Sequence, residues 1–260
     1  MLAIVAALFF FGCGEKQDGE FSSLLAGAKT VPTAIVDPMT TGSIEGTVFL
    51  DGPLPVVRPI DMDSEAACAK ANRPGTYQGS VVTGDNASLA NVAVYVKGGL
   101  SHYRFATPTD HVVLDQKGCM YAPRIVALMT HQDLEIRNDD ATIHNVHAMP
   151  KTNVEWNKAQ RAGGAALETS FSQPELAIPF MCNVHSWMRA FIFVFDNPYY
   201  SVTSGQGKFE LKNLPPGTYT IEAWQEKFGT QAQTVTVAPR QSRTISFRFK
   251  SAQVSGDSDR

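Results

Sequence analysis

Three residues that could bind a soft metal ion follow one another at regular spacing: Cys182, His185 and Met188 form a C-x-x-H-x-x-M run. The run lies between two strand-like segments, residues 179–181 and the apolar residues 191–195, so one tight turn would present all three side chains. Thiolate and thioether sulfur are soft donors that select copper, and imidazole suits both copper oxidation states. A trigonal arrangement of two imidazoles and one thiolate, with a long axial thioether, requires one further histidine.

That histidine is available upstream, in the run Asn138-Asp-Asp-Ala-Thr-Ile-His144-Asn-Val-His147. The run follows a strand-like segment, so His144 stands at a strand end, where it could complete the donor set. The alternative interpretation is that Cys182 is a buried core thiol and that the histidines are ordinary surface residues. Met188 and the upstream H-N-V-H segment favour the metal site, because a core thiol needs neither of them.

On these motifs the chain resembles the cupredoxins, the blue copper proteins, and their amicyanin- and plastocyanin-like members most closely. The resemblance covers residues 111–196. It rests on the H-N-V-H segment, on the ligand loop that ends with Met188-Arg189, and on strand-like segments at 112–123 and 134–138. It implies one type 1 copper ion with four ligands: His144, Cys182, His185 and Met188.

The same resemblance assigns roles to residues beside the ligands. Asn145 is expected to hold the ligand loop near the thiolate through its side-chain amide; the alternative is a simple turn residue. His147 lies two residues beyond His144, so on a strand it points to the same side but further from the loop. We expect His147 beside the site or at the surface and not among the ligands. Val184 and Ser186 replace prolines common in the family's loop, so the family's loop stiffness does not carry over.

In the cupredoxin family the second histidine of the loop lies at the surface within an apolar rim, where redox partners dock. The resemblance therefore places His185 at the surface, and Trp187 beside it. A short loop leaves little chain to cover a tryptophan, so we expect Trp187 to contribute to the docking patch. The alternative role is to shield copper from water. Both roles predict exposed apolar surface near His185, which suits brief electron-transfer encounters.

The function that the resemblance implies is the transfer of single electrons between redox protein partners. No Ser-His-Asp, H-E-x-x-H or phosphate-loop pattern is found, and four protein ligands leave no open metal position for a substrate, so we expect no enzymatic activity. One alternative is a protein that captures or delivers copper. Another is a surface binding module, with Trp224 and Tyr219 as candidate contact residues; the simpler interpretation of Trp224 is a partly buried strand aromatic.

The start of the chain indicates export. Residues 1–13 are almost wholly apolar, are too short to cross a bilayer, and resemble a signal peptide with a lipobox in which Cys13 is acylated. Plain secretion is the alternative. Residues 14–42 are typical of a flexible tether, and residues 251–260 are expected to be a disordered tail. We therefore expect a bacterial periplasmic or cell-surface protein that contacts the membrane only through a lipid anchor.

The composition bears on the number of domains, on nucleic-acid binding and on the roles of the cysteines. A chain of 260 residues, 43% of them hydrophobic, has room for two modest domains, and a net charge of −3 gives no reason to expect nucleic-acid binding. With Cys13 assigned to lipid and Cys182 to metal, Cys68 and Cys119 remain. In an oxidising compartment these two are expected to form a disulfide, which could stabilise the fold by about 4 kcal/mol. Two free buried thiols are the alternative.

Strand-like segments in which apolar and polar residues alternate with a period of two follow one another from residue 43 to residue 249, which predicts an all-β fold. Near its end, the run from Gly207 to Tyr219 reads G-x-F-x-L-x-x-L-P-P-G-x-Y and resembles the carboxypeptidase regulatory-like (transthyretin-like) β-sandwich family. The opening strand of that family, I-x-G-x-V, is matched far upstream, at residues 44–48.

We therefore expect one regulatory-like β-sandwich built from residues 43–110 and 197–250, with a cupredoxin Greek-key β-sandwich, residues 111–196, inserted between its strands. Insertions are tolerated at surface turns. The alternative is a fusion of two domains in series, which leaves the last segment with few strands and an open sheet edge. Residues 151–170 contain Gly163-Gly164 and little periodicity, which predicts a loop with one short helix.

Overall fold

The structure is a computed structural model that describes residues 35–56 and 58–251. It is built almost entirely of strands; the helical elements of this part are α1 (Ala66–Ala71) and the 3-10 turn η1 (Asp85–Ala87). No helix among the described residues is long and apolar enough to cross a membrane. The predicted signal peptide with Cys13, the tether up to residue 34 and the tail from residue 252 lie outside the described residues.

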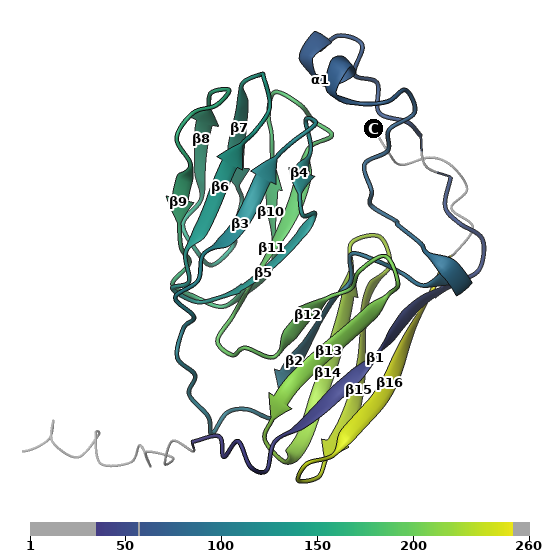
Figure 1. Ribbon diagram of the computed structural model, residues 1–260, viewed down its shortest axis with the longest axis vertical. Helices are drawn as coiled ribbons and strands as arrows, with labels where there is room; N and C mark the ends of the chain where they lie inside the picture. Colours follow the sequence, from purple (N-terminus) through teal and green to yellow (C-terminus); the bar gives the residue numbers. More distant parts are fainter. Residues whose placement is uncertain (1–34, 57, 252–260) are drawn as a thin grey trace, which may run out of the picture. The chain divides into compact units, whose positions relative to one another are not determined.

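Strands from the beginning and the end of the described chain enclose one core, and we call this unit the split sandwich. One sheet has the order β13-β1-β16 and the other the order β12-β2-β14-β15. The bounds are β1 Gly42–Asp51, β2 Ala93–Gly98, β12 Tyr200–Val202, β13 Lys208–Leu214, β14 Gly217–Gln225, β15 Gly229–Val237 and β16 Ser242–Lys250. Alternate side chains such as Val48, Val94 and Phe247 point inward and are fully buried. In Figure 1 the first strand (purple) and the last strand (yellow) lie side by side, and they pair in parallel.

Residues 112–195 form a second pair of sheets, which we call the middle sandwich. The sheet orders are β5-β11-β10-β7-β8 and β4-β3-β6-β9. The bounds are β3 Val112–Gln116, β4 Tyr121–Ala122, β5 Ile125–Met129, β6 Leu134–Asn138, β7 His144–Ala148, β8 Trp156–Gln160, β9 Leu167–Thr169, β10 Glu175–Met181 and β11 Arg189–Phe195. Leu114, Ile136 and Phe180 are among the fully buried side chains of its core. In chain order, all these strands come between β2 and β12 of the split sandwich.

The prediction for residues 151–170 is wrong, because this segment contains strands β8 and β9 and no helix. β8 lies at the edge of its sheet and pairs only with β7. Its central residues 157–159 are all exposed. A strand whose two faces both meet water lacks the alternation of apolar and polar residues by which strands are recognised in a sequence.

The two sandwiches share a third apolar cluster, made of Ala93, Tyr95, Ile125, Phe193 and Phe195. The half-buried Trp224 packs beside this cluster, with its ring centroid 5.1 Å from those of both Phe191 and Phe193. Tyr219 is 1% exposed. The suggestion that Tyr219 contributes to a binding surface is therefore wrong, and Trp224 has the packing role of a strand aromatic.

An ion pair also connects the sandwiches. Arg124 precedes β5 of the middle sandwich and Glu226 follows β14 of the split sandwich. The Nη2 of Arg124 donates to Oε2 of Glu226 at 2.8 Å, and the side chains are only 7% and 8% exposed. A paired, hydrogen-bonded charge is tolerated in such a position, whereas either partner alone would be costly.

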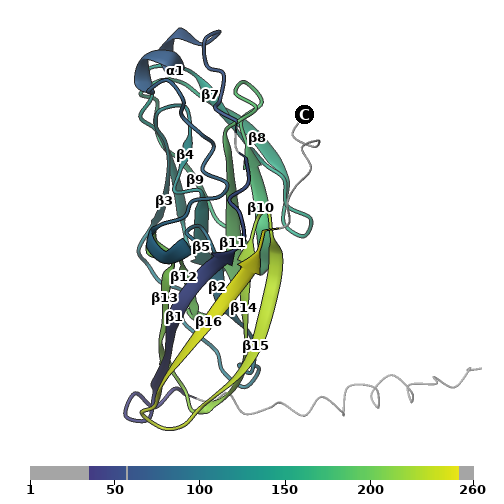
Figure 2. The ribbon, with the colours of Figure 1, turned by 90° about the vertical axis from the view of Figure 1, so that its right-hand side faces the viewer.

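Between β1 and β2 the chain makes a long excursion, and we call its residues 58–80 the strap. The strap carries α1 and is joined by a disulfide, Cys68–Cys119, to the connection between β3 and β4. The bond closes a loop of 51 residues, for which the chain-entropy model gives about 4 kcal/mol of stabilisation. The amide of Asn72 donates to the carbonyl oxygen of Gly118 at 2.8 Å, a second tie. Figure 2 shows α1 at the end of the middle sandwich where β4 and β7 lie.

Candidate metal centre

Three ligand atoms meet at one end of the middle sandwich. One ring nitrogen from each of His144 and His185 and the sulfur of Cys182 lie within 4.8 Å of one another. The two Nδ1 atoms are 2.9 Å apart, and the sulfur is 3.8 Å from Nδ1 of His185. None of the three residues is more than 1% exposed. Folding therefore brings three of the four predicted ligands together in a buried position.

The strand order explains why these residues meet. His144 is the first residue of β7, and Cys182 directly follows β10. β7 and β10 are antiparallel neighbours, so the start of one lies beside the end of the other. His185 lies in the turn that leads from β10 to β11. Two packed strands and one short turn thus position all three donors.

Met188, the fourth predicted ligand, closes this turn. Its carbonyl oxygen accepts a hydrogen bond from the N–H of Cys182 at 3.2 Å, and its own N–H donates to the carbonyl oxygen of His185 at 2.9 Å. Its side chain is fully buried and belongs to the same apolar cluster as Cys182. A weakly bonding thioether in this place would be kept from water, which is one of the ways a protein tunes a metal.

Asn145 ties the turn to β7. Its Oδ1 accepts hydrogen bonds from the N–H groups of Asn183 at 2.7 Å and Val184 at 3.3 Å, and lies 3.4 Å from the sulfur of Cys182. The hydroxyl of Tyr121 donates to the carbonyl oxygen of Asn145 at 2.8 Å. Asn145 therefore holds the backbone directly after Cys182, as expected from the sequence.

Asp140 orients His144, a role that the sequence analysis missed. Its Oδ2 lies 2.9 Å from Nε2 of His144. The carboxylate also accepts hydrogen bonds from the N–H groups of Gly118 at 2.6 Å and Cys119 at 2.7 Å, both residues with positive φ. Because the carboxylate accepts the Nε2 proton, Nδ1 is left to face the other two donors. The run Asn138-Asp-Asp contained the signal, but spacing alone could not choose between Asp139 and Asp140.

Hydrogen bonds within the site shift the pKa values of Asp140, His144 and Cys182 toward their charged forms. Burial alone would raise the pKa of Asp140, but hydrogen bonds from His144, Cys119 and Gly118 lower that pKa overall. Burial would lower the pKa of His144, but hydrogen bonds with Asp140 and Cys182 raise it to about 9. Burial would raise the pKa of Cys182, yet hydrogen bonds from His144 and neighbouring backbone amides lower it. Both shifts favour the charged forms, a Cys182 thiolate beside a His144 imidazolium, and an ion that binds both residues would displace the His144 proton.

The other ring nitrogen of His185 faces the strap. Its Nε2 is 3.6 Å from Sγ of Cys68 and 3.8 Å from Oε2 of Glu65. The residue is 0% exposed, so the expectation that His185 lies at the surface within an apolar rim is wrong. The strap covers His185, and its Cys68 lies 117 residues before His185 in the chain. Nothing in the sequence of the ligand loop indicates that a distant segment covers this ring. Burial and the charge on His144 lower the pKa of His185, which favours the neutral ring.

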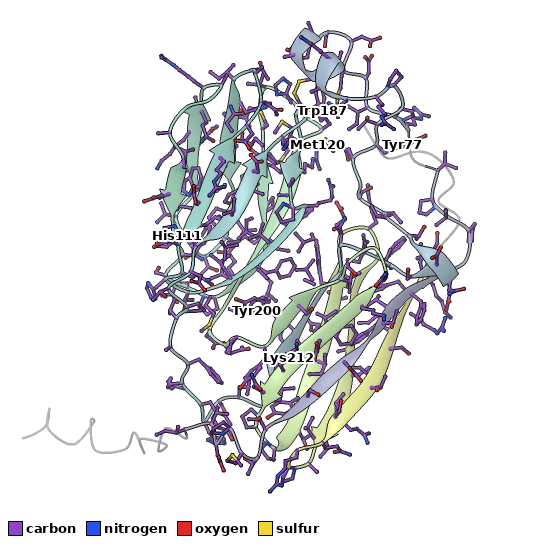
Figure 3. The ribbon with its side chains drawn as sticks, viewed as in Figure 1. Tyr77, His111, Met120, Trp187, Tyr200 and Lys212 are labelled. Atoms are coloured by element: carbon purple, nitrogen blue, oxygen red, sulfur yellow. A yellow bond between two sulfur atoms is a disulfide. The ribbon has the colours of Figure 1, made fainter. Side chains whose placement is uncertain are left out.

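Trp187 adjoins the donor group, whereas His147 lies outside it. Figure 3 shows Trp187 at the end of the middle sandwich that faces the strap. Its Nε1–H donates to the carbonyl oxygen of Cys119 at 2.9 Å, and its half-buried ring is 5.2 Å from the ring of His185. His147 pairs with Glu155 at 2.8 Å and is not among the converging ligand atoms.

The donor set fits a copper ion. Two imidazole nitrogens and one thiolate converge, with a buried thioether at the end of the same turn, and soft sulfur combined with imidazole suits copper. Metal–nitrogen bonds are about 2 Å long, so the two Nδ1 atoms, 2.9 Å apart, would have to separate only slightly.

Residues 189–250 match the carboxypeptidase regulatory-like domain. The matched residues include β12 to β16 of the split sandwich, and β1 and β2, which complete its two sheets, come earlier in the chain. A search of curated proteins found no match.

Similar solved structures include copper proteins. A copper-containing nitrite reductase from Thermus scotoductus is 15% identical, with a TM-score of 0.32; the match covers 36% of this chain and 24% of that chain. For a purple cupredoxin from Nitrosopumilus maritimus the identity is 19% and the TM-score 0.25, over 29% and 81% of the two chains. A methionine-to-alanine variant of amicyanin in its Cu(I) form is 18% identical, with a TM-score of 0.30. That match covers 40% of this chain and 98% of the amicyanin chain. The fold is all-β, two pairs of sheets, and the split sandwich contains β12 to β16 of the residues that match the carboxypeptidase regulatory-like domain.

Proposed function

We propose that this protein is an exported type 1 copper protein that carries single electrons between redox protein partners. The observation that carries the proposal is the convergence of His144, Cys182 and His185, all buried and all held at the ends of packed strands. In this proposal Met188 is the axial ligand. Four protein ligands would leave no open metal position for a substrate, so we propose a carrier and not an enzyme.

The residues around the donors suit this task. Copper bound here would supply one-electron chemistry, since it is stable as Cu(I) and Cu(II). Asp140 fixes the ring of His144, and Asn145 fixes the backbone after Cys182. Donors held by such bonds cannot rearrange toward the different geometries that the two oxidation states prefer, so little movement accompanies each transfer. Burial of the donors excludes water from the site.

Export and the docking of partners are further parts of the proposal. The disulfide supports an oxidising compartment, the periplasm or the cell surface, where Cys13 would carry the lipid anchor. Because the strap covers His185, we propose that partners approach beside Trp187, whose ring lies 5.2 Å from that of His185. Trp187→Ala should then slow electron exchange more than it changes the absorption spectrum; a large shift of the spectrum with an unchanged exchange rate would contradict this docking role.

The test of the copper centre is an absorption spectrum of the purified, copper-loaded, oxidised protein. We expect an intense thiolate-to-Cu(II) band, which Cys182→Ser should abolish because the band requires the thiolate. Cys182 is the free cysteine of the described residues. Met188→Leu is the matched control: it should keep the band and raise the reduction potential, since only the weak axial donor is removed. A blue Cys182→Ser protein would refute the assignment.

Voltammetry separates this proposal from the capture or delivery of copper. An electron carrier should show reversible one-electron cycling with the ion retained in both states. A delivery protein would bind Cu(I) but lose the ion or fail to cycle on oxidation. The second outcome would replace the proposed function while leaving the ligand set intact.

A further inference from the structure

His185 lies between two sets of possible ligands, of which the proposed copper centre uses one. Its Nδ1 faces His144 and Cys182, whereas its Nε2 faces the disulfide. The sulfurs of Cys68 and Cys119 and a nitrogen of His185 form a second group whose ligand atoms all lie within 4.8 Å of one another. All three residues are at most 1% exposed. The proposed electron transfer needs neither of these sulfurs as a ligand.

We propose that reduction of the Cys68–Cys119 disulfide creates a second metal site, which binds Cu(I) through the two cysteine sulfurs next to Nε2 of His185. A disulfide offers only weak neutral sulfur donors, whereas a pair of thiolates is the kind of soft ligand that Cu(I) selects. The disulfide is therefore a closed form of the site and the dithiol its open form. The inference requires only the dithiol pair, so it stands whether or not the neighbouring centre transfers electrons.

The change between the forms is a thiol–disulfide exchange with a dithiol reductant, either a thioredoxin-like protein or a small dithiol. A thiolate of the reductant attacks one sulfur of the pair, the S–S bond breaks, and a second thiolate of the reductant resolves the mixed disulfide. Two electrons and two protons reach Cys68 and Cys119, and the reductant leaves as its own disulfide. Cu(I) then displaces the two thiol protons.

The two cysteines are held near each other by contacts other than the disulfide. Asn72 donates to the carbonyl oxygens of both Cys68 and Gly118, each at 2.8 Å, and so connects the strap to the residue before Cys119. On the other side, the N–H of Cys119 donates to Asp140 and its carbonyl oxygen accepts from Trp187. The strap should therefore stay in place when the bond is cut, with both sulfurs still facing His185.

Apolar packing also holds the strap against the middle sandwich. Met62 of the strap is 5% exposed and packs in the core cluster of the middle sandwich together with Cys68 and Cys119. Glu65 lies beside the sulfur pair with its side chain 41% exposed, and its Oε2 is 3.8 Å from Nε2 of His185. This partly exposed carboxylate lies beside the same ring nitrogen that faces Sγ of Cys68.

A neutral imidazole binds a metal through one nitrogen and carries its proton on the other. Nε2 of His185 can therefore assist the sulfur pair only while Nδ1 is not bound to an ion. When the first centre is full, two thiolates alone must hold the second ion. We thus expect the second Cu(I) to bind more weakly than the first.

The experiment is a Cu(I) titration of the purified mature protein against a chromogenic Cu(I) chelator, without oxygen. One sample keeps its disulfide; the other is reduced with dithiothreitol, which is then removed. We expect one bound Cu(I) per chain with the disulfide and two after reduction. Cys68→Ser and Cys119→Ser should each bind one in both samples. Cys182→Ser, the reciprocal variant, should keep one Cu(I) at the sulfur pair after reduction only.

The fold is checked on the same samples by circular dichroism, and the double variant Cys68→Ala/Cys119→Ala shows whether the strap holds without the bond. One Cu(I) in both forms of the wild type overturns the proposal, as does a second ion that persists in Cys68→Ser. Unfolding on reduction also overturns it, because the site requires a docked strap. Failure of the proposed function would appear elsewhere, as an oxidised protein without a thiolate-to-Cu(II) band.

Discussion

The split sandwich and the middle sandwich are both pairs of sheets around an apolar core, yet they bury different polar side chains. In the split sandwich the buried polar groups, for example Thr203 and Gln225, bond to nearby backbone carbonyls. The middle sandwich buries a larger set around the candidate centre: Gln116, Asn138, Asp140, His144, Asn145, Gln160 and His185. A buried polar group is tolerated when it is hydrogen-bonded, so the second arrangement depends on many bonds being made together.

Strand ends bring this polar set together. Gln116 and Asn138 are the last residues of β3 and β6, which are parallel neighbours, and Gln160 ends β8 opposite His144. Gln116 donates to Gln160 at 2.6 Å, and Asn138 accepts from the N–H of Asp140 at 3.1 Å. A connected set of this kind fixes one arrangement of the groups near the donors. The comparison indicates that one sandwich supplies mainly stability and the other supplies the chemistry as well.

A large cavity in the split sandwich should lower the free energy of unfolding without altering the metal centre. Phe247 is fully buried, and its ring centroid lies 6.1 Å from that of Phe209 in a tilted arrangement. Phe247→Ala should cost about 3–5 kcal/mol of unfolding free energy, measured by chemical denaturation, with the copper spectrum unchanged. The matched change is Phe180→Ala, equally buried but two residues before Cys182. It should cost a similar amount and also alter the spectrum; identical spectra for both variants would contradict the division of roles.

The ion pair between the sandwiches tests whether the two regions unfold as one. Glu226→Ala leaves the buried guanidinium of Arg124 without its carboxylate and should destabilise the protein by about 3 kcal/mol. Because this pair connects the sandwiches, we expect two unfolding transitions where the wild type has one. Asp51→Ala is the control, since its pair with Arg248 is 45% and 57% exposed and should contribute less than about 1 kcal/mol. Equal effects of the two variants would refute the importance of burial here.

The all-β fold could be predicted from the sequence because its cause is local. Val94 and Val96 of β2 alternate with Val92 just before the strand, and all three are buried in one core. The convergence of Cys182 and His185 likewise depends on a short spacing within one turn. Residues that act across the chain were less visible in the sequence.

The strap illustrates what the sequence could not reveal. Cys68 and Glu65 reach His185 from a segment far away in the chain, and α1 has only six residues. A segment with so little regular structure has no periodicity from which its position could be derived. The same limit applies to Asp140, whose role depends on N–H groups of Gly118 and Cys119 that only the folded turn presents.

Asp140 allows a test of how far the polar set controls the donors. Asp140→Asn keeps a group that can accept the Nε2 proton of His144 but removes the negative charge. We expect copper affinity to fall about 10- to 100-fold, the usual effect of altering a group that orients a ligand. A competition titration with a chelator measures this. Asp139→Asn, a change at the exposed neighbouring residue, should leave the affinity unchanged; equal losses for both would mean that net charge, not orientation, is responsible.

The smallest expected effect concerns Glu175, the first residue of β10. Cys182 follows the other end of this strand, and an extended chain places the two residues about 20 Å apart. Its carboxylate accepts hydrogen bonds from the N–H groups of Lys151, Thr152 and Asn153. Burial would raise the pKa of Glu175, but these bonds outweigh it and lower the pKa. The folded protein therefore favours the ionised form.

A lowered pKa in the folded state stabilises the protein above the pKa of the unfolded chain, about 4.3, and this contribution is lost as the pH falls through the folded value. Glu175→Gln should therefore cost about 1 kcal/mol at neutral pH, reduced from a fully buried case by solvent screening. The difference from the wild type should vanish in acid, and copper affinity should not change. Denaturation curves at several pH values measure this, with Glu168→Gln as the exposed control. A loss that persists at low pH would mean that the amide disturbs packing, not that the charge is missing.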